Sequence, residues 1–342
     1  MPEIIDHLAS LTGLRDRDTL DVSLAHAICD MLAPQRVAIY RLVGEQGEEC
    51  WFNRATLEAD SPAATSDAAW VDLEDLPRGA DRGRWLECMT SGQVIAERAA
   101  DGVTTLFPVM SDTGAVGVIV LKTPRGLGDK MRRLVFGVLR IYRNVQSLLD
   151  YSERDTLTGL LNRKIFDDSF YKVSALPLIE AQIGEGERRA TQRARYWLGV
   201  VDIDHFKLVN DRFGHLIGDE VLLLLSRIMR GAFRFSDQLY RFGGEEFVVL
   251  LLCADEADAT AALDRFRKVV EAYPFPQAGT ITVSIGFTVI EAGDTPAAAF
   301  ERADRAVYHA KNNGRNQVRS HAALIREHLI EDDKRIGDVE LF

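Results

Sequence analysis

A chain of 342 residues is longer than one ordinary small domain, and two domains are the natural expectation. Its net charge of −11 argues against a general nucleic-acid binder, because such a protein needs a basic face to exchange with phosphate counterions. No apolar stretch approaches the roughly 18–20 residues that span a bilayer, so no membrane partner is expected. The acidic start of the chain also lacks the basic flank of a secretion signal, and the sequence therefore predicts a cytoplasmic protein.

The first part of the chain alternates helix and strand patterns. Leu20, Leu24 and Ile28 recur at helical spacing, whereas the strands that follow alternate in hydrophobicity or form short apolar runs. This pattern indicates an α+β module, an antiparallel sheet with helices. The expected elements are a helix at residues 19–33, a strand at 36–43, a turn at 44–47, a strand at 48–55, a long loop or lid at 60–83, and a hairpin joining 103–110 to 115–122.

The last two strands of this part, Leu106-Phe107-Pro108-Val109 and the run from Gly114 to Leu121, resemble the end of a GAF domain. PAS domains share this layout, so both families stay open. The resemblance implies a GAF-like sensor domain over residues 1–127, with a ligand that the sequence does not identify.

The four cysteines show no close pairing and no Cys-x-x-Cys spacing. Zinc sites and short-range disulfides have such spacings. Free thiols are therefore expected at Cys29, Cys50, Cys88 and Cys253.

A helix is expected at residues 128–154, between the two halves of the chain. Its apolar residues repeat at heptad spacing, which is typical of a coiled coil, and they are Leu134, Val138, Ile141, Val145 and Leu148. One interpretation is a parallel dimer stalk that acts as a helical linker. The other is a helix that packs on the N-terminal domain.

The second half of the chain predicts a sheet covered by helices. A polar insertion at residues 180–195 contains the arginines Arg188, Arg189, Arg193 and Arg195, which are interpreted as a solvated loop. The other expected elements are helices at 163–173, 218–235, 256–273 and 295–313, strands at 196–203 and 280–290, a hairpin near 238–252, and a short terminal strand.

The hairpin carries Gly243-Gly244-Glu245-Glu246 between two strand patterns. Glycines at a turn let an oligophosphate approach the backbone closely, and the adjacent acids can hold a divalent cation against it. A solvated hairpin tip would be the default interpretation of such a turn, but other motifs accompany it.

Four further blocks accompany the hairpin in a fixed order. They are Asp155-Thr156-Leu157-Thr158-Gly159 with the following Leu160-Leu161-Asn162-Arg163, the strand end Asp202-Ile203-Asp204-His205-Phe206-Lys207, the run from Asn210 to Asp219, and Lys311-Asn312-Asn313-Gly314-Arg315-Asn316. With these blocks the chain resembles the GGDEF family of diguanylate cyclases over residues 155–320, before a tail at 321–342. The resemblance implies a palm-like nucleotide cyclase fold and the condensation of two GTP into cyclic di-GMP and two pyrophosphate.

The resemblance assigns metal contacts to Asp202, the carbonyl oxygen of Ile203, and Glu245. Hard oxygen ligands in an open site suit Mg²⁺, for which Mn²⁺ can substitute. Such ions would polarise the α-phosphate and stabilise the pyrophosphate leaving group. Glu245 and Glu246 are the catalytic candidates, and the sequence leaves open which group takes the proton.

Substrate contacts are implied for a second set of residues. Asn210 and Asp219 would read the guanine edge, because a carboxylate accepts from N1–H and the exocyclic amine of guanine, whereas adenine offers an acceptor at N1. His215 would line this pocket. Lys207, Lys311 and Arg315 fit phosphate contacts.

Arg234 and Asp237 lie just before the hairpin strand and match the RxxD product-inhibition site of the family at the same offset from Gly243. An arginine can pair with phosphate and stack on guanine, and the aspartate can accept from the guanine edge. Arg265 could join from the following helix. Cyclic di-GMP is therefore expected both as product and as inhibitor.

A homodimer is expected, because each 3′-hydroxyl must reach the α-phosphate of the other GTP. One alternative is a catalytically silent domain that senses GTP or cyclic di-GMP, and another is a scaffold that signals through dimer contacts. Silent members usually lose a hairpin acid or the strand acid, and this chain retains all of them.

Overall fold

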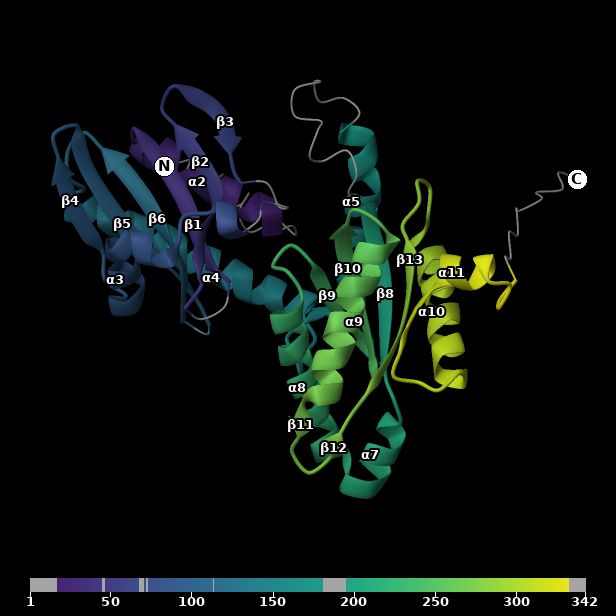
Figure 1. Ribbon diagram of the computed structural model, residues 1–342. Helices are drawn as coiled ribbons and strands as arrows, with labels where there is room; N and C mark the ends of the chain where they lie inside the picture. The colour runs from purple at the N-terminus through teal and green to yellow at the C-terminus, as the bar shows by residue number, and fades with distance from the viewer. Residues whose placement is uncertain are drawn as a thin grey trace, which may run out of the picture. The chain divides into compact units, whose positions relative to one another are not determined.

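The computed structural model describes residues 17–44, 47–67, 71, 73–112, 114–180 and 195–331. The chain divides into two compact units, Met1–Ser152 and Glu153–Phe342, each of which combines helices with a sheet (Figure 1). Most of the predicted polar insertion, with Arg188, Arg189 and Arg193, lies outside the described residues, as does the second half of the predicted tail, residues 332–342. Within the described ranges, no helix is both long enough and apolar enough to cross a membrane.

The N-terminal unit is built on a six-stranded antiparallel sheet in the order β3-β2-β1-β6-β5-β4. Its strands are β1 (Arg36–Val43), β2 (Cys50–Glu58), β3 (Ser61–Thr65), β4 (Ile95–Ala99), β5 (Gly102–Ser111) and β6 (Gly114–Thr123). Its helices are α2 (Arg17–Leu32), α3 (Gly83–Ser91) and α4 (Asp129–Glu153), with 3-10 turns η1 (Leu73–Asp75) and η2 (Gly79–Arg82).

Both faces of this sheet are covered. Successive side chains of a strand point to opposite faces, so Val37 and Ile39 of β1 lie together on one side, where they pack with α2 and α4. On the other side Trp85 of α3 packs against Tyr40 and Trp51, with ring centroids 4.6 and 5.2 Å apart. The antiparallel sheet with helices agrees with the predicted module.

Helix α4 packs one apolar stripe on the N-terminal unit. The buried residues of the stripe are Val135, Val138, Tyr142, Val145 and Leu149. Two positions of the predicted heptad seam, Val138 and Val145, belong to this intramolecular core, which favours the packed-helix interpretation for them. The seam residue Leu148 is 70% exposed, and Leu134 and Ile141 are partly buried.

A buried polar cluster joins α4 to the sheet. Asp21 of α2, which is 3% exposed, accepts from Arg41 Nη2 at 3.0 Å, from Arg54 Nε at 3.0 Å and from the Tyr142 hydroxyl. Burial alone would raise the pKa of Asp21, but Arg41, the Tyr142 hydroxyl and Arg54 outweigh it and hold that pKa below its ordinary value. The cluster therefore keeps its carboxylate ionised.

Residues 60–83 were predicted to form one long loop or lid. This prediction is wrong, because the segment contains β3 and both 3-10 turns. Helix α3 and strand β4 were also not predicted. The strand at 36–43 and the hairpin of β5 and β6 are confirmed. All four cysteines are free, and Cys50 and Cys88 are buried.

The C-terminal unit has a second six-stranded sheet, in the order β14-β13-β8-β10-β9-β7. Its strands are β7 (Leu161–Asn162), β8 (Arg195–Ile203), β9 (Gln238–Gly243), β10 (Glu246–Cys253), β13 (Val283–Val289) and β14 (Val318–Ser320), and a separate small ribbon pairs β11 (Pro274–Phe275) with β12 (Gly279–Thr280). Its helices are α5 (Arg163–Glu180), α7 (Phe206–Phe213), α8 (His215–Ala232), α9 (Glu256–Ala272), α10 (Pro296–Asn312) and α11 (His321–Arg326).

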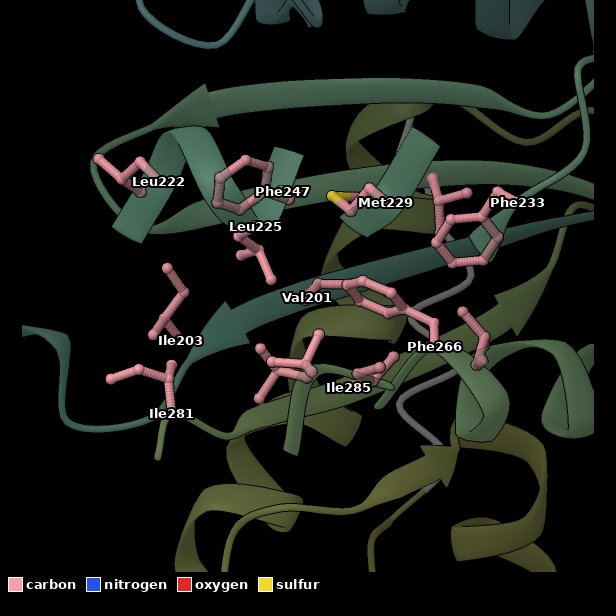
Figure 2. Close-up of a cluster of buried hydrophobic side chains, with 14 of the residues drawn as sticks. Val201, Ile203, Leu222, Leu225, Met229, Phe233, Phe247, Phe266, Ile281 and Ile285 are labelled. Carbon is pink, nitrogen blue, oxygen red and sulfur yellow. The ribbon is translucent and has the colours of Figure 1, made fainter. Parts of the chain in front are cut away.

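Helices cover both faces of this sheet (Figure 1). On one face α8 and α9 pack on odd-numbered residues of β8 such as Val201 and Ile203, and Figure 2 shows their side chains converging with Leu225 and Phe266. On the other face α5 and α10 pack on even-numbered residues such as Val200. Asp202 shares the parity of Val200, so the strand directs its carboxylate toward the side of α10.

Most of the predicted elements of this unit are confirmed. Strand β7, the ribbon of β11 and β12, and helix α11 were not predicted, and Arg195, predicted in the polar insertion, instead begins β8. Helix α7 was not predicted, and α8 begins at His215 instead of residue 218. The helix predicted at 163–173 extends to Glu180.

Candidate active site

The turn between β9 and β10 has a backbone that favours glycine. Gly243 has φ 141° and Gly244 has φ 54°, values that L side chains rarely adopt. Gly243 pairs with Glu246, so Gly244 and Glu245 form the two-residue tip. The predicted hairpin is confirmed, and its geometry places two adjacent carboxylates at one end of the sheet.

Arg241 braces this hairpin. Its guanidinium donates to the carbonyl of Gly244, at 2.9 Å from Nη2, and to Asp155 Oδ1, at 3.0 Å from Nη1. Asp155 also accepts from the N–H and hydroxyl of Thr158, at 2.8 and 2.7 Å. Burial would raise the pKa of Asp155, but Thr158 and Arg241 together hold it below its ordinary value. The Asp-Thr-Leu-Thr motif is thereby tied to the glutamate turn.

Asp202 lies next to this turn. Its Cα is the cross-strand partner of Glu246, and its Oδ1 forms an ion pair with Lys311 Nζ of α10 at 2.7 Å. Asp202 is 6% exposed, and burial raises its pKa. Lys311 opposes that rise, whereas the charges of Glu246 and Asp204 add to it. Negative charge therefore exceeds positive charge around a buried carboxylate.

Glu245 belongs to the same electrostatic group. Burial raises its pKa, the charge of Asp202 raises it further, Lys311 lowers it, and Glu246 adds a smaller rise. The chain thus brings Asp202, Glu245, Glu246 and Lys311 together at one edge, although they come from three distant segments.

The chemistry of this edge fits a divalent cation. Its candidate ligands are hard oxygens. Burial, with a further contribution from neighbouring acids, raises the pKa values of Asp202 and Glu245, and a bound cation would favour their ionised forms. Among the described residues no group of three or more His, Cys, Asp or Glu is gathered as a metal centre. A set of two carboxylates and the Ile203 carbonyl would leave further coordination positions to substrate oxygens and water.

The predicted guanine contacts lie on α7 and α8. Asn210 is partly buried near the end of α7, and a Cβ on Gly218 would come within 2.0 Å of its Oδ1, so only glycine leaves room for this amide. Asp219 follows on α8 and is exposed, as are Lys207 and His215. Glycine at residue 218 thus determines how closely the amide approaches α8.

Arg315 lies in the turn that follows α10. It is exposed, has φ 60°, and its N–H donates to the Ala310 carbonyl at 2.9 Å. Lys311 lies one helical turn earlier and is the residue that pairs with Asp202. Two of the three predicted phosphate ligands therefore come from the end of α10 and its following turn, whereas Lys207 lies on α7.

Residues 152–317 match the sequence profile of the family described as diguanylate cyclase, GGDEF domain. This segment is a GGDEF domain. The chain is 40% identical over 167 residues to the diguanylate cyclase DgcP of Pseudomonas aeruginosa, a match of 48% of this chain and 23% of that protein. It is 38% identical over 189 residues to the response regulator PleD of Caulobacter vibrioides, covering 53% and 38% respectively.

Among solved structures, the GGDEF domain of DgcB from Caulobacter crescentus in complex with c-di-GMP is 31% identical, with a TM-score of 0.44. The match covers 50% of this chain and 96% of that one. The chain spans well under half of the length of both curated relatives named above.

The predicted RxxD pair lies away from the hairpin of the GGDEF domain. Asp237 precedes β9, whose six residues separate it from the glutamate turn by about 20 Å. Asp237 Oδ2 accepts from the backbone N–H of Arg234 at 2.9 Å, and the Arg234 side chain is exposed. Burial raises the pKa of Asp237, against the opposing hydrogen bond and charge of Arg234. Arg265 also lies near Asp237, because its positive charge lowers the pKa of that carboxyl group.

Sequence reasoning assigned no role to Asp155, Asp204, Arg241 and Asn316, which hold the site together. Their positions inside the matched blocks were the only available signal, because their partners are distant in the chain. Asp204 contacts Asn316, for example, across 112 positions.

Proposed function

We propose that this protein is a diguanylate cyclase that condenses two GTP into cyclic di-GMP and two pyrophosphate. The observation that carries the proposal is the group at the edge of the GGDEF domain. There Glu245 and Glu246 of the glycine turn meet buried Asp202, which is paired with Lys311. A domain that kept only the fold would not need this concentration of acidic charge.

Asp202, the Ile203 carbonyl and Glu245 would hold Mg²⁺, or Mn²⁺ in its place. When bound, the metal supplies Lewis-acid stabilisation of the α-phosphate and of the pyrophosphate leaving group. The protein residues orient this chemistry, since the β8–β10 pairing fixes Asp202 opposite Glu246 and the glycine tip fixes Glu245. Glu245 and Glu246 are the candidates for accepting the proton of the 3′-hydroxyl.

Asn210 and Asp219 would bind the guanine edge, with His215 beside them. Lys207, Lys311 and Arg315 would bind the phosphates, and Arg315 can bind two oxygens at once. Discrimination against ATP follows from Asp219, because adenine would leave this carboxylate without its donors.

The activity is tested by incubating the purified protein with GTP and Mg²⁺ and identifying the product by mass spectrometry. Glu245→Gln should abolish turnover and keep the fold, because the residue lies at a turn. Glu301→Gln, an exposed glutamate of the same unit, is the matched control and should retain the wild-type rate. Full activity of Glu245→Gln would contradict the assigned role.

Catalysis would require a homodimer. The cyclic product forms when the 3′-hydroxyl of each GTP attacks the α-phosphate of the other, and one half-site holds a single GTP. The rate should therefore rise more steeply than linearly with protein concentration near the dimer dissociation constant. Because Val138 and Val145 are buried within one chain, the test of a stalk uses exposed Leu148 and Tyr151. Serine at both positions should weaken dimerisation on light scattering if α4 forms the stalk.

Arg234 and Asp237 would bind cyclic di-GMP as an inhibitor, with Arg265 as a further candidate. Support comes from their separation from the hairpin by the length of β9, which allows a ligand to bind away from the substrate. Arg234→Ala should raise the cyclic di-GMP that accumulates, with little change in the initial rate. Unchanged affinity for the product on calorimetry would show that the RxxD string is a coincidence.

The N-terminal unit would regulate the cyclase as a GAF-like sensor. Support comes from the six-stranded antiparallel sheet and from α4, which packs on this sheet and continues to the boundary of the GGDEF domain. A catalytically silent sensor or scaffold is the competing proposal. GTP binding without product on mass spectrometry would favour it.

A further inference from the structure

Asp204 is the first residue beyond β8 and is 4% exposed. Its Oδ1 accepts from the Ser284 hydroxyl at 2.7 Å, and its Oδ2 accepts from the Thr282 hydroxyl at 2.7 Å and from the backbone N–H of Asn316 at 3.0 Å. Its own N–H donates to the Thr282 carbonyl at 2.9 Å. Both carboxylate oxygens thus accept hydrogen bonds from protein donors, whereas Asp202 forms its ion pair with one lysine through Oδ1 alone.

The Asn316 end of this contact lies in a strained turn. Arg315 and Asn316 have φ values of 60° and 42°, and adjacent non-glycine residues adopt this conformation only where their surroundings hold them. Helix α9 supplies two such contacts, because Arg267 Nη1 donates to Asn316 Oδ1 and Asn316 Nδ2 donates to Glu271, each at 2.8 Å. Asp204 supplies the contact to the main chain.

The end of β8 therefore contacts the chain at two points, one in the last turn of α10 and one in the turn that follows it. Asp202 pairs with Lys311 at 2.7 Å, and Asp204 accepts from Asn316 at 3.0 Å. Arg315 lies between these two points in the chain. Asp204 holds the backbone next to this exposed arginine through the Asn316 N–H, and Asp202 holds the side chain of Lys311 one helical turn earlier.

We propose that Asp204 is a positioning residue for GTP, which acts by holding the turn that presents Arg315 to the phosphates. This inference rests on the proposed function in taking Arg315 as a phosphate ligand. Asp204 touches neither substrate nor metal in this role. Its loss would release the main chain of Asn316, let the two left-handed residues relax, and displace the guanidinium of Arg315.

The test measures GTP binding by calorimetry on the full chain, with a GTP analogue that is not turned over. Asp204→Asn keeps the shape of the side chain but turns one acceptor oxygen into a donor that faces a hydroxyl or an N–H. The dissociation constant should rise about tenfold, as expected when a charged hydrogen-bonded contact is lost. Arg315→Ala should raise it as well, and the double variant should bind no more weakly than Arg315→Ala alone.

A merely structural role of Asp204 would not give this pattern. The inference is overturned if folded Asp204→Asn binds the analogue as wild type does, or if its effect adds fully to that of Arg315→Ala. It also fails if Arg315→Ala leaves binding unchanged. If the wild type forms no cyclic di-GMP but the coupling is found, the proposed activity fails and the positioning role stands.

A milder pair of variants covers the case in which Asp204→Asn does not fold. Thr282→Val removes one donor to Asp204 Oδ2, whereas Thr288→Val makes the same change on β13 at a hydroxyl that contacts Arg302. Thr282→Val should weaken analogue binding about threefold, since one of three hydrogen bonds is lost. Equal affinities of the two variants would overturn the inference.

Discussion

Two buried aspartates, one in each unit, have opposite environments. Asp21 is 3% exposed and bonded to two arginines and a tyrosine hydroxyl, and these partners hold its pKa below the ordinary value although burial acts the other way. Asp202 is 6% exposed, with one lysine partner and two further acids nearby, and its pKa is raised, chiefly by burial. Two carboxylates that are both largely inaccessible to solvent therefore have pKa values shifted in opposite directions, because their partners differ.

The contrast in partners and pKa distinguishes a carboxylate that stabilises its unit from one whose surroundings are typical of a ligand-binding carboxylate. A buried charge with a full set of partners contributes to the folded state, and removing one partner leaves an uncompensated charge. A buried carboxylate with too few partners lowers stability, and such groups cluster at functional sites. On this comparison Asp21 fixes α2 and α4 to the sheet, whereas the environment of Asp202 is consistent with the cation ligand proposed above.

The largest expected effect is on the activity of Asp202→Asn. The amide keeps the shape of the side chain and removes the charge that would hold the metal, so the rate of cyclic di-GMP formation should fall at least about a hundredfold. The unfolding midpoint of the C-terminal unit should stay the same or rise, because a carboxylate with a raised pKa is destabilised in its ionised form.

Asp304→Asn is the control for that variant, since Asp304 is exposed on the same unit. It should change neither activity nor stability. A large loss of stability in Asp202→Asn would remove the distinction between the two aspartates.

The elements that could be predicted from sequence are those whose pattern is local. Strand β1 has the predicted bounds, and the glycine turn has the predicted form, because alternation and turn chemistry are properties of neighbouring residues. Helix α7 was missed because Asn210-Asp211-Arg212 gives its second half the composition of a loop. Strand β3 was missed because alanine and proline hide its weak pattern.

In helix α4 the heptad spacing of apolar residues predicts a helix but does not determine which of its faces is buried. Leu134, Ile141 and Leu148 form one apolar row, and Val135, Tyr142 and Leu149 form the next, with Val138 and Val145 common to both. The sheet buries the second row, since Tyr142 can reach Asp21 from it. The heptad spacing alone could not determine which row faces the core.

The site divides in the same way. Asp202, Glu245 and Lys311 could be predicted from their motif blocks, and the structure brings them to one edge. The contacts of Asp204 and Asp155 could not be predicted, because they depend on pairings such as Asp155 with Arg241, 86 positions apart.

The second expected effect is a loss of stability in Asp21→Asn. The substitution leaves Arg41 and Arg54 without their shared carboxylate, and breaking a buried ion pair of this kind costs about 3 kcal/mol. Urea unfolding followed by tryptophan fluorescence measures it. Trp197→Phe is introduced into both the wild type and Asp21→Asn, so that the fluorescence comes only from Trp51, Trp70 and Trp85 of the N-terminal unit.

The two variants should thus have opposite defects: Asp21→Asn should lose stability, and Asp202→Asn should lose activity. Asp21→Asn, at a temperature where it is folded, should still form cyclic di-GMP, whereas Asp202→Asn should form it at least about a hundredfold more slowly. If Asp21→Asn leaves the unfolding free energy unchanged, the polar cluster does not secure α4 in the way that its hydrogen bonds indicate.

The smallest expected effect is a difference in pH dependence, and it follows from the opposite directions of the two pKa shifts. Asp21 has a lowered folded pKa, so its contribution to stability is fully present above the unfolded value and is lost as the pH falls below about 4. Asp202 has a raised folded pKa, so its unit instead loses stability as the pH rises from about 4 through that raised value. In the Trp197→Phe background, the unfolding free energy of the N-terminal unit should therefore decrease on acidification. Asp21→Asn should flatten this slope, because residue 21 then has no carboxylate to be protonated. An acid slope of the same steepness in Asp21→Asn would assign the titration to other carboxylates, and the contrast between the two aspartates would then rest on their partners alone.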